Sequence, residues 1–292
     1  MSPESLHRIV EEIARDNRQG ATALTRLAAE AFARAAREGR EREELRSAVV
    51  ALAEKRPMMA SIFDFSNRLL FFLDDGPDGE ATAAFCLDYL RKMEEDAERV
   101  VNGAAALLAE KKSVFTHSFS SLVFHALLRV HERGEGVRVY CSESRPANEG
   151  VELAGRLCEA GLEVTLATDV AAAMLVGRVE TVLIGADGVG TFGLVHKAGT
   201  WPLLLVAKEY GIPVYSLLPS SKFWPAARAF PSEPPKPADE VAPLGCYEVY
   251  NRYFDTTPSK FLNGFVTEKG VLKPEEVEKE CRGKAMHPML SG

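Results

Sequence analysis

The chain has 292 residues, 46% of them hydrophobic and 26% charged, with a formal net charge of −7. This length accommodates two domains or one large one, and the acidic balance argues against nucleic acid as the main partner, because phosphate backbones bind basic surfaces. The sequence has no apolar run of about 18 residues, so we expect no membrane span. The N-terminus is too charged for a signal peptide, which indicates a cytoplasmic protein. The five cysteines are scattered without ligand spacing, so we expect reduced thiols and no metal site.

The first part of the chain has the period of amphipathic helices. Apolar residues such as Leu6, Ile9 and Ile13 recur at spacings of three and four, and the pattern continues to about residue 110. It is interrupted at the Arg-Pro step 56–57 and at the stretch DDGPDG, where proline and glycine favour chain breaks. We therefore predict a helical N-terminal domain over residues 1–110.

From residue 111 onwards strands and helices alternate. Gly134, Gly161 and Gly211 end successive helical segments, as C-terminal caps do. Five short runs rich in β-branched residues precede or separate these segments: SVFTH, VRVYCS, LEVTLAT, TVLIGAD and IPVYSLLP. Such alternation predicts a parallel, doubly wound sheet over residues 111–292, an α/β fold. Ligands bind outside the carboxyl ends of such strands, so the loops that follow, PSSKFWP among them, are the candidate sites. The proline-rich segment 219–243 should lack regular structure and wrap the surface.

The fourth of these runs leads into a G-x-G-x-x-G pattern at Gly188, Gly190 and Gly193. In a dinucleotide fingerprint the third glycine opens a helix whose N-terminus meets the pyrophosphate, and an acidic residue about 20 positions on binds the ribose. Here the next helix is predicted only from Thr200, and the acidic residue is absent. We therefore reject a dinucleotide enzyme, predict no cofactor, and interpret the stretch as a flexible glycine loop between Asp187 and the pair His196-Lys197. A carboxylate at a strand end, such as Asp187, is most often a structural turn cap.

Longer phrases carry a family resemblance along most of the chain. They are GADGVGTFGLVHKAGT, SESRP and FDTTPSKFLNGFVTEKG in the second half, and DNRQGATALTRLAAEA and RPMMASIFDFSNRLL in the first. Together they resemble a superfamily that contains the alpha, beta and delta subunits of eukaryotic translation initiation factor 2B and their archaeal relatives. It also contains isomerases acting on ribose 1,5-bisphosphate and on 5-methylthioribose 1-phosphate. The resemblance implies a helical domain on a Rossmann-like domain, a site in the cleft between them, and a homodimer or higher homo-oligomer.

The resemblance also implies two catalytic positions. The isomerases use an aspartate in a G-A-D loop and a cysteine in a T-H-C-N-type loop. The aspartate corresponds to Asp187, but the cysteine position falls on Ser118, whose hydroxyl is far less acidic than a thiol. Cys141, at the end of the second strand, is the one thiol that a neighbouring loop offers, although a small buried hydrophobe is the commoner role for such a residue.

The ligand-binding positions implied by the resemblance are partly altered here. The isomerases' R-G-A phosphate loop reads Gln19-Gly20-Ala21 after Arg18, a glutamine appears as Glu149, and an Asn-Lys pair reads His196-Lys197. Three retained cations still describe an anion site. The alternative is that Arg145 caps its own loop and Arg56 is a solvated charge at a helix end. The implied phosphate- or ligand-binding set is Gly20, Ala21, Arg56, Arg145, Glu149, His196 and Lys197.

Two functions from different classes follow. One is a regulatory or scaffolding protein that binds a phosphorylated small molecule, a sugar phosphate or a nucleotide, in the cleft. The other is an aldose–ketose isomerase of a C1-phosphorylated sugar that moves the proton through Asp187. The missing thiol favours the binding protein, while the retained aspartate and cations keep the isomerase open.

Overall fold

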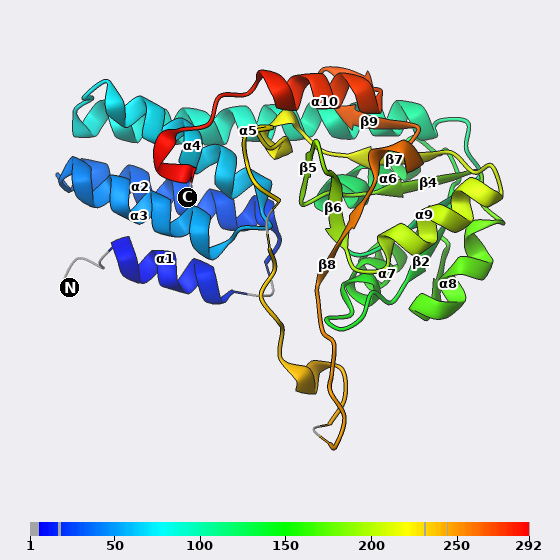
Figure 1. Ribbon diagram of the computed structural model, residues 1–292. Coiled ribbons are helices and arrows are strands. Elements are labelled where there is room, and N and C mark those ends of the chain that lie inside the picture. The colour runs from blue at the N-terminus through cyan, green and yellow to red at the C-terminus, as the bar shows by residue number, and fades with distance from the viewer. Residues whose placement is uncertain (1–5, 17–18, 231, 244, 292) are drawn as a thin grey trace.

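The computed structural model describes residues 6–16, 19–230, 232–243 and 245–291, so Arg18 lies outside the described residues. The N-terminal part is helical, as predicted, and the two predicted breaks lie at residues 56–59 and 75–78. Its helices are α1 (Leu6–Arg15), α2 (Ala21–Arg37), α3 (Arg42–Lys55), α4 (Ala60–Asp74) and α5 (Gly79–Leu108). Figure 1 shows α1 to α4 gathered on one side of the molecule.

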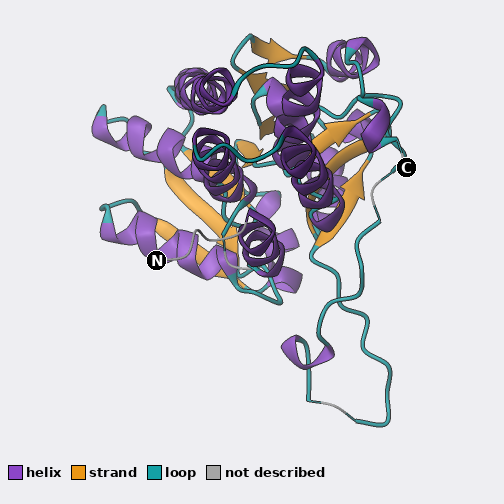
Figure 2. Cartoon of the chain, turned by 90° about the vertical axis from the view of Figure 1, so that its left-hand side faces the viewer, coloured by secondary structure: helices purple, strands orange, loops and turns teal. Residues whose placement is uncertain are grey.

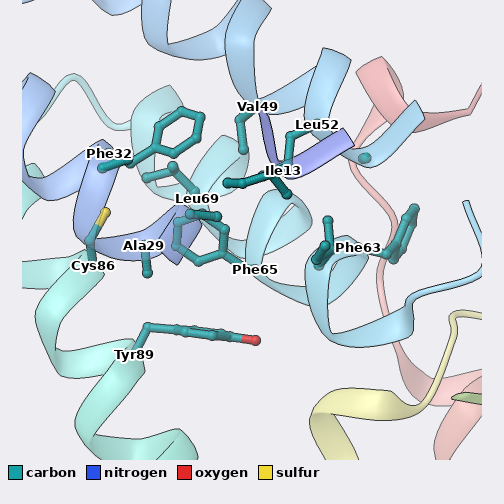
Figure 3. Packing of buried hydrophobic residues seen from close by; sticks show 14 of the residues in the cluster. Ile13, Ala29, Phe32, Val49, Leu52, Phe63, Phe65, Leu69, Cys86 and Tyr89 are labelled. Atoms are coloured by element: carbon teal, nitrogen blue, oxygen red, sulfur yellow. The ribbon is translucent and has the colours of Figure 1, made fainter. Parts of the chain in front are cut away.

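Aromatic rings at the centre of this helical part hold three of the helices together. Phe65 of α4 lies between Phe32 of α2 and Tyr89 of α5, with edge-to-face centroid distances of 5.8 and 5.2 Å (Figure 3). Edge-to-face packing of aromatic rings adds to the stabilisation from burying their apolar area. The amphipathic stripes read from the sequence therefore meet in one core.

The second part contains a seven-stranded sheet with helices between its strands. In the order β3-β2-β1-β4-β7-β9 all neighbouring strands are parallel, and β10 adds an antiparallel edge. The elements are β1 (Ser113–Thr116), α6 (Ser121–Glu132), β2 (Arg138–Ser142), α7 (Glu149–Glu159), β3 (Val164–Ala167), α8 (Asp169–Val176), β4 (Thr181–Ile184), α9 (Thr200–Glu209), β7 (Val214–Leu217), β9 (Gly264–Thr267), β10 (Gly270–Leu272) and α10 (Pro274–Gly283).

This topology confirms the doubly wound α/β prediction. The five predicted runs form β1, β2, β3, β4 and β7, and the phrase GFVT adds β9 as a sixth parallel strand. The strand order reverses between β1 and β4. At such a reversal the loops after the two strands diverge and leave a crevice at the carboxyl ends. The loop after β1 carries Ser118, and the loop after β4 carries Asp187.

The interpretation of the glycine stretch as a flexible loop is wrong. It forms a hairpin of β5 (Gly188–Gly190) and β6 (Gly193–Lys197), and β8 (Phe254–Thr257) completes a three-stranded antiparallel sheet. Gly193 has φ 123° and an added Cβ would meet the carbonyl oxygen of Thr257 at 2.5 Å. Glycine is required there because two strands approach closely, and not because a phosphate needs room. Helix α9 begins at Thr200, as predicted, with Gly199 as the capping residue.

Helix α5 belongs to both parts of the molecule. Its first half contributes Cys86 and Tyr89 to the helical core, and its second half contributes Val101 and Leu108 to the core beneath the sheet. Figure 1 shows the helix running from the helical side into the side that contains the sheet. Near the C-terminus Leu290 returns to the helical core. The boundary predicted near residue 110 thus follows a helix that packs on both sides.

The prediction that the proline-rich segment wraps the surface is wrong. Residues 232–243 and 245–253, here called the arm, project away from the body as two limbs that lead back to it as β8 (Figures 1 and 2). Apart from the short 3-10 turn Ala238–Glu240, the described part of the arm has no helix or strand. The limbs lie side by side at the base, where the Lys236 amide donates to the Asn251 carbonyl at 3.4 Å.

Candidate functional site

A cavity of about 500 Å³ lies between the helical part and the carboxyl ends of the sheet. Its walls come from the start of α2, the loops after β1 and β4, the end of β6 and the base of the arm. Eight of the nine residues predicted for the site line it: Gly20, Ala21, Arg56, Ser118, Glu149, Asp187, His196 and Lys197. Arg145 does not.

Asp187 follows β4 and faces the cavity. Its main chain is fixed, because its amide donates to the Val195 carbonyl and its carbonyl accepts from the Ala60 amide, both at 3.0 Å. Burial raises the pKa of its carboxyl to about 6, against the opposing effect of the nearby Lys222 ammonium. Among the described residues no hydrogen bond reaches the carboxylate. It is therefore available to a ligand hydroxyl or to a proton.

Lys222 is a site residue that the sequence prediction missed. It ends the 3-10 turn Ser220–Lys222 after β7, and its Nζ donates to the Ala186 carbonyl at 2.6 Å. Burial lowers the pKa of this ammonium, while the Asp187 carboxylate raises it. The sequence predicted the loop PSSKFWP as a candidate site because it follows a strand, but it did not single out Lys222 within that loop.

His196 presents an unprotonated nitrogen to the cavity. Its Nδ1 lies 2.9 Å from Thr200 Oγ1, and that hydroxyl donates to the Lys197 carbonyl at 2.6 Å. The hydroxyl proton is thereby committed, so Nδ1 must be the donor and Nε2 carries the lone pair. Burial lowers the pKa of the ring well below its ordinary value, which keeps it neutral. His196 is therefore a hydrogen-bond acceptor in a wall that is otherwise rich in donors.

Lys197, the last residue of β6, forms a buried ion pair. Its Nζ lies 2.8 Å from Glu149 Oε1 and 5.3 Å from the centre of the Tyr253 ring. Lys236 of the arm lies over the same ring at 4.5 Å. Glu149 Oε2 is buried and has no partner in the described part of the chain. Two ammonium groups thus converge on one aromatic ring at the cavity wall.

Arg56 is buried, which overturns its interpretation as a solvated charge at a helix end. Its Nε and Nη2 donate to the Ile13 carbonyl at 2.9 and 2.7 Å, and Nη2 also contacts the Asp16 carbonyl. Burial lowers the pKa of its guanidinium. The side chain both lines the cavity and fixes the end of α1 against the end of α3.

Arg145 lies on the loop after β2, with its guanidinium away from the cavity. Its Nη2 donates to two main-chain carbonyls of the arm, Glu240 at 3.2 Å and Val241 at 3.1 Å. Its own amide donates to Asp169 Oδ2 at 2.7 Å, and the Ser144 amide donates to Oδ1 of the same carboxylate at 2.8 Å. The prediction that Arg145 lies in the cleft does not match this placement.

Ser118 stands where the resemblance leads one to expect a thiol. It has φ 65°, in the left-handed region, and its amide donates to Ser144 Oγ at 2.8 Å. Cys141 is not among the lining residues. Burial raises the pKa of its thiol to about 12, and its Sγ lies 3.9 Å from the Thr165 carbonyl. No cysteine among the described residues lines the cavity.

The cavity has a mixed but donor-rich electrostatic character. Helices α2 and α6 begin at it, with residues 20–23 and 120–122 in its wall, and first-turn amides carry partial positive charge. Arg156 pairs with Glu152 at 2.6 Å and lies 5.0 Å from the centre of the Phe119 ring. Five cationic side chains face four carboxylates: Arg56, Arg156, Lys197, Lys222 and Lys236 against Asp16, Glu149, Glu152 and Asp187. A phosphate group would find donors at several places in this wall.

The described residues offer neither a metal site nor a membrane-spanning helix. Within the described ranges no three side chains of His, Cys, Asp or Glu are grouped so that they could hold a metal ion. None of the described helices has the length and apolar character that crossing a membrane requires.

Comparison with known proteins identifies relatives along nearly the whole chain. The model of the initiation factor 2 subunit family matches residues 17–274. A translation initiation factor eIF-2B subunit 2-like protein of Pyrococcus abyssi is 31% identical over 94% of this chain and 98% of its own length. The ribose 1,5-bisphosphate isomerase of Archaeoglobus fulgidus is 30% identical over 88% and 86%. The crystal structure of the Pyrococcus horikoshii translation initiation factor eIF-2B is similar with a TM-score of 0.82, at 28% identity, over 94% of this chain and 100% of that one.

Proposed function

The chain belongs to the initiation factor 2 subunit family, and from this premise we propose that its cavity binds a phosphorylated small molecule without the isomerase chemistry that uses a thiol. The ligand is a sugar phosphate or a nucleotide, and the protein acts as a regulatory or scaffolding subunit. One observation carries the proposal. A single cavity, rich in hydrogen-bond donors, is lined by eight of the residues that were predicted from the sequence, and no cysteine among the described residues lines it.

The wall offers different chemistry to the two halves of such a ligand. Lys197, Lys236 and the first turn of α2 supply positive charge and hydrogen-bond donors, which suit phosphate oxygens. Asp187 and the Nε2 atom of His196 are acceptors, which suit hydroxyl groups. Ligand hydroxyls would then satisfy these acceptors while the phosphate occupies the cationic side.

Isomerisation of a C1-phosphorylated sugar is the second candidate, and the state of Asp187 favours it. A carboxyl with a pKa of about 6 exists in both protonation states near neutral pH, as a proton carrier must. The relative from Archaeoglobus fulgidus is named for this reaction on ribose 1,5-bisphosphate. Against it stands Ser118, because a hydroxyl without an adjacent base does not ionise at this pH.

A thermal-shift screen tests binding directly. Ribose 5-phosphate, ribose 1,5-bisphosphate, 5-methylthioribose 1-phosphate and AMP are compared, since a ligand at about 100 times its Kd stabilises the folded state by about 2.7 kcal/mol. Lys236→Ala should remove about half of this stabilisation, as a tenfold loss of affinity does, whereas the exposed Lys279→Ala should leave it unchanged. No shift with any of the four compounds would contradict the proposal.

An activity assay separates the two candidates. We expect no turnover of either C1-phosphorylated sugar by the native protein. Turnover that is lost separately in Asp187→Asn and in Ser118→Ala would establish the isomerase, with serine in the role of the thiol.

We also propose that the protein is a homodimer, or a multiple of one, joined through the sheet-containing part. An apolar surface on α8 and α9 supports this: Val170 is 90% and Met174 70% exposed, and Leu205 and Tyr210 are exposed beside them. Figure 1 shows α8 and α9 side by side at the edge of the molecule. Patches of this kind mark interfaces between proteins. Light scattering that finds only a 31.9 kDa species at micromolar concentration would refute it, and Val170→Glu should weaken association.

A further inference from the structure

The base of the arm forms part of the cavity wall. Lys236 comes from its outgoing limb and Tyr253 from its returning limb, and both line the cavity, as does Phe254 at the start of β8. These residues are far from the other lining residues in the sequence. The cavity is therefore complete only when the arm is in place.

The two limbs are held to each other by carboxylates of the arm itself. Glu233 accepts from the amides of Tyr253 and Phe254 at 3.0 and 3.3 Å, and it lies 3.6 Å from Lys236. Glu240 accepts from the Tyr253 hydroxyl at 2.6 Å. These bonds keep the shape of the arm, but none of them ties it to the body.

Arg145 ties the arm to the body near the 3-10 turn. Its guanidinium donates to the two carbonyls at residues 240 and 241, and its main chain is pinned by Asp169 at the start of α8. A second tie is the Ala198 amide, which donates to the Tyr253 carbonyl at 2.8 Å. A chain of polar contacts thus runs from α8 through Arg145 and Glu240 to the ring of Tyr253.

We propose that Arg145 is a positioning residue that holds the arm so that Lys236 and Tyr253 reach the ligand. The physical reason is entropic, since a projecting segment without regular structure samples many conformations unless it is tied at both ends. Arg145 supplies the tie nearest to the 3-10 turn. This inference rests on the proposed function, which supplies the phosphorylated ligand. In it Arg145 does not contact the phosphate directly but affects binding by positioning the arm.

Hydrogen exchange tests the tie without any ligand. In Arg145→Ala, amides of the peptide spanning residues 248–256 should exchange about five times faster, because the loss of two solvent-accessible hydrogen bonds changes the opening equilibrium by about that factor. Arg145→Lys should be intermediate, since one ammonium can still reach a carbonyl. Arg133→Ala, an exposed arginine at the end of α6, is the matched control and should leave exchange unchanged. Unchanged exchange in Arg145→Ala would overturn the proposal.

Binding of ribose 5-phosphate, with inorganic phosphate as the minimal anion, tests the coupling to the cavity. Titration calorimetry should find affinity about fivefold lower in Arg145→Ala and about tenfold lower in Lys236→Ala. If Arg145 acts through the arm, the losses of Arg145→Ala and Lys236→Ala are less than additive, so the double variant loses clearly less than the about fiftyfold that independent contacts would give. Additive losses, which indicate direct contact by Arg145, or an unchanged affinity in Arg145→Ala, would overturn it. If only another compound of the thermal-shift screen binds, the same titrations use that compound. If none binds, the proposed function fails, and faster exchange in Arg145→Ala still decides whether the tie exists.

Discussion

The ion pair of Lys197 and Glu149 gives the most direct test of the site's energetics. Lys197→Met keeps the length of the side chain and removes its charge. The Lys197 side chain is 4% exposed and that of Glu149 31%, with 2.8 Å between Nζ and Oε1. A charge-assisted hydrogen bond contributes about 1.5–3 kcal/mol, and breaking a fully buried pair costs about 3–5 kcal/mol. Because water can reach part of Glu149, we expect a loss of about 2 kcal/mol.

The loss should come from the carboxylate that remains. Glu149 Oε2 already has no partner in the described residues, so the substitution leaves both oxygens unpaired. The double variant Glu149→Gln/Lys197→Met should therefore recover to within about 1 kcal/mol of the native protein. Urea unfolding followed by circular dichroism measures each variant, with exposed Lys279→Met as control. If Lys197→Met is as stable as the native protein, or if the Glu149→Gln substitution adds a further loss, the reasoning is wrong.

Two further predictions concern the walls of the site. Burial raises the pKa of Asp187 to about 6, above its pKa in the unfolded chain. Between these two pKa values the folded state binds more protons than the unfolded state, so the free energy of unfolding falls as the pH rises from 4 to 6. Asp187→Asn should thus be about 3 kcal/mol more stable than the native protein at pH 8 and nearly equal to it at pH 4 in urea unfolding; a difference independent of pH would contradict this. In α7, Gly150→Ala should cost about 3 kcal/mol, because its Cβ would lie 1.7 Å from the Ser142 carbonyl oxygen. Gly155→Ala in the same helix has nothing within 4 Å and should gain about 0.5–1 kcal/mol, and calorimetric melting compares the two.

Local patterns predicted most of the fold. Period, breaks and capping glycines depend on neighbouring residues, so the helical part and five parallel strands could be recognised from the sequence alone. The position of Asp187 followed as well, because a residue at the end of a central strand must lie near the crevice. The glycine hairpin could not be recognised, since Gly193 is explained only by its approach to Thr257, which is distant in the sequence.

The residues of the site were predictable only where the local element fixed their place. Lys222 and Lys236 reach the cavity because of the path that the chain takes after β7, and proline-rich sequence has no period from which to infer that path. Arg145 was assigned to the cleft because the family resemblance of SESRP implies a ligand-binding position there. Its guanidinium instead donates to two carbonyls of the arm. Which carbonyls lie within its reach depends on tertiary packing, which the local sequence does not reveal.

Helix α5 has a consequence for how the chain can be divided. A fragment ending at residue 110 would present Val101 and Leu108 bare to water, and a fragment beginning at 111 would lack the helix that covers one face of its sheet. Neither fragment keeps a closed hydrophobic core, so we expect both to aggregate when expressed alone. Recombination between family members at this point would place the second half of α5 from one parent against the sheet of another. We therefore expect exchange of one half among relatives to succeed only when the apolar face of the second half of α5 comes from the same parent as the sheet that it covers.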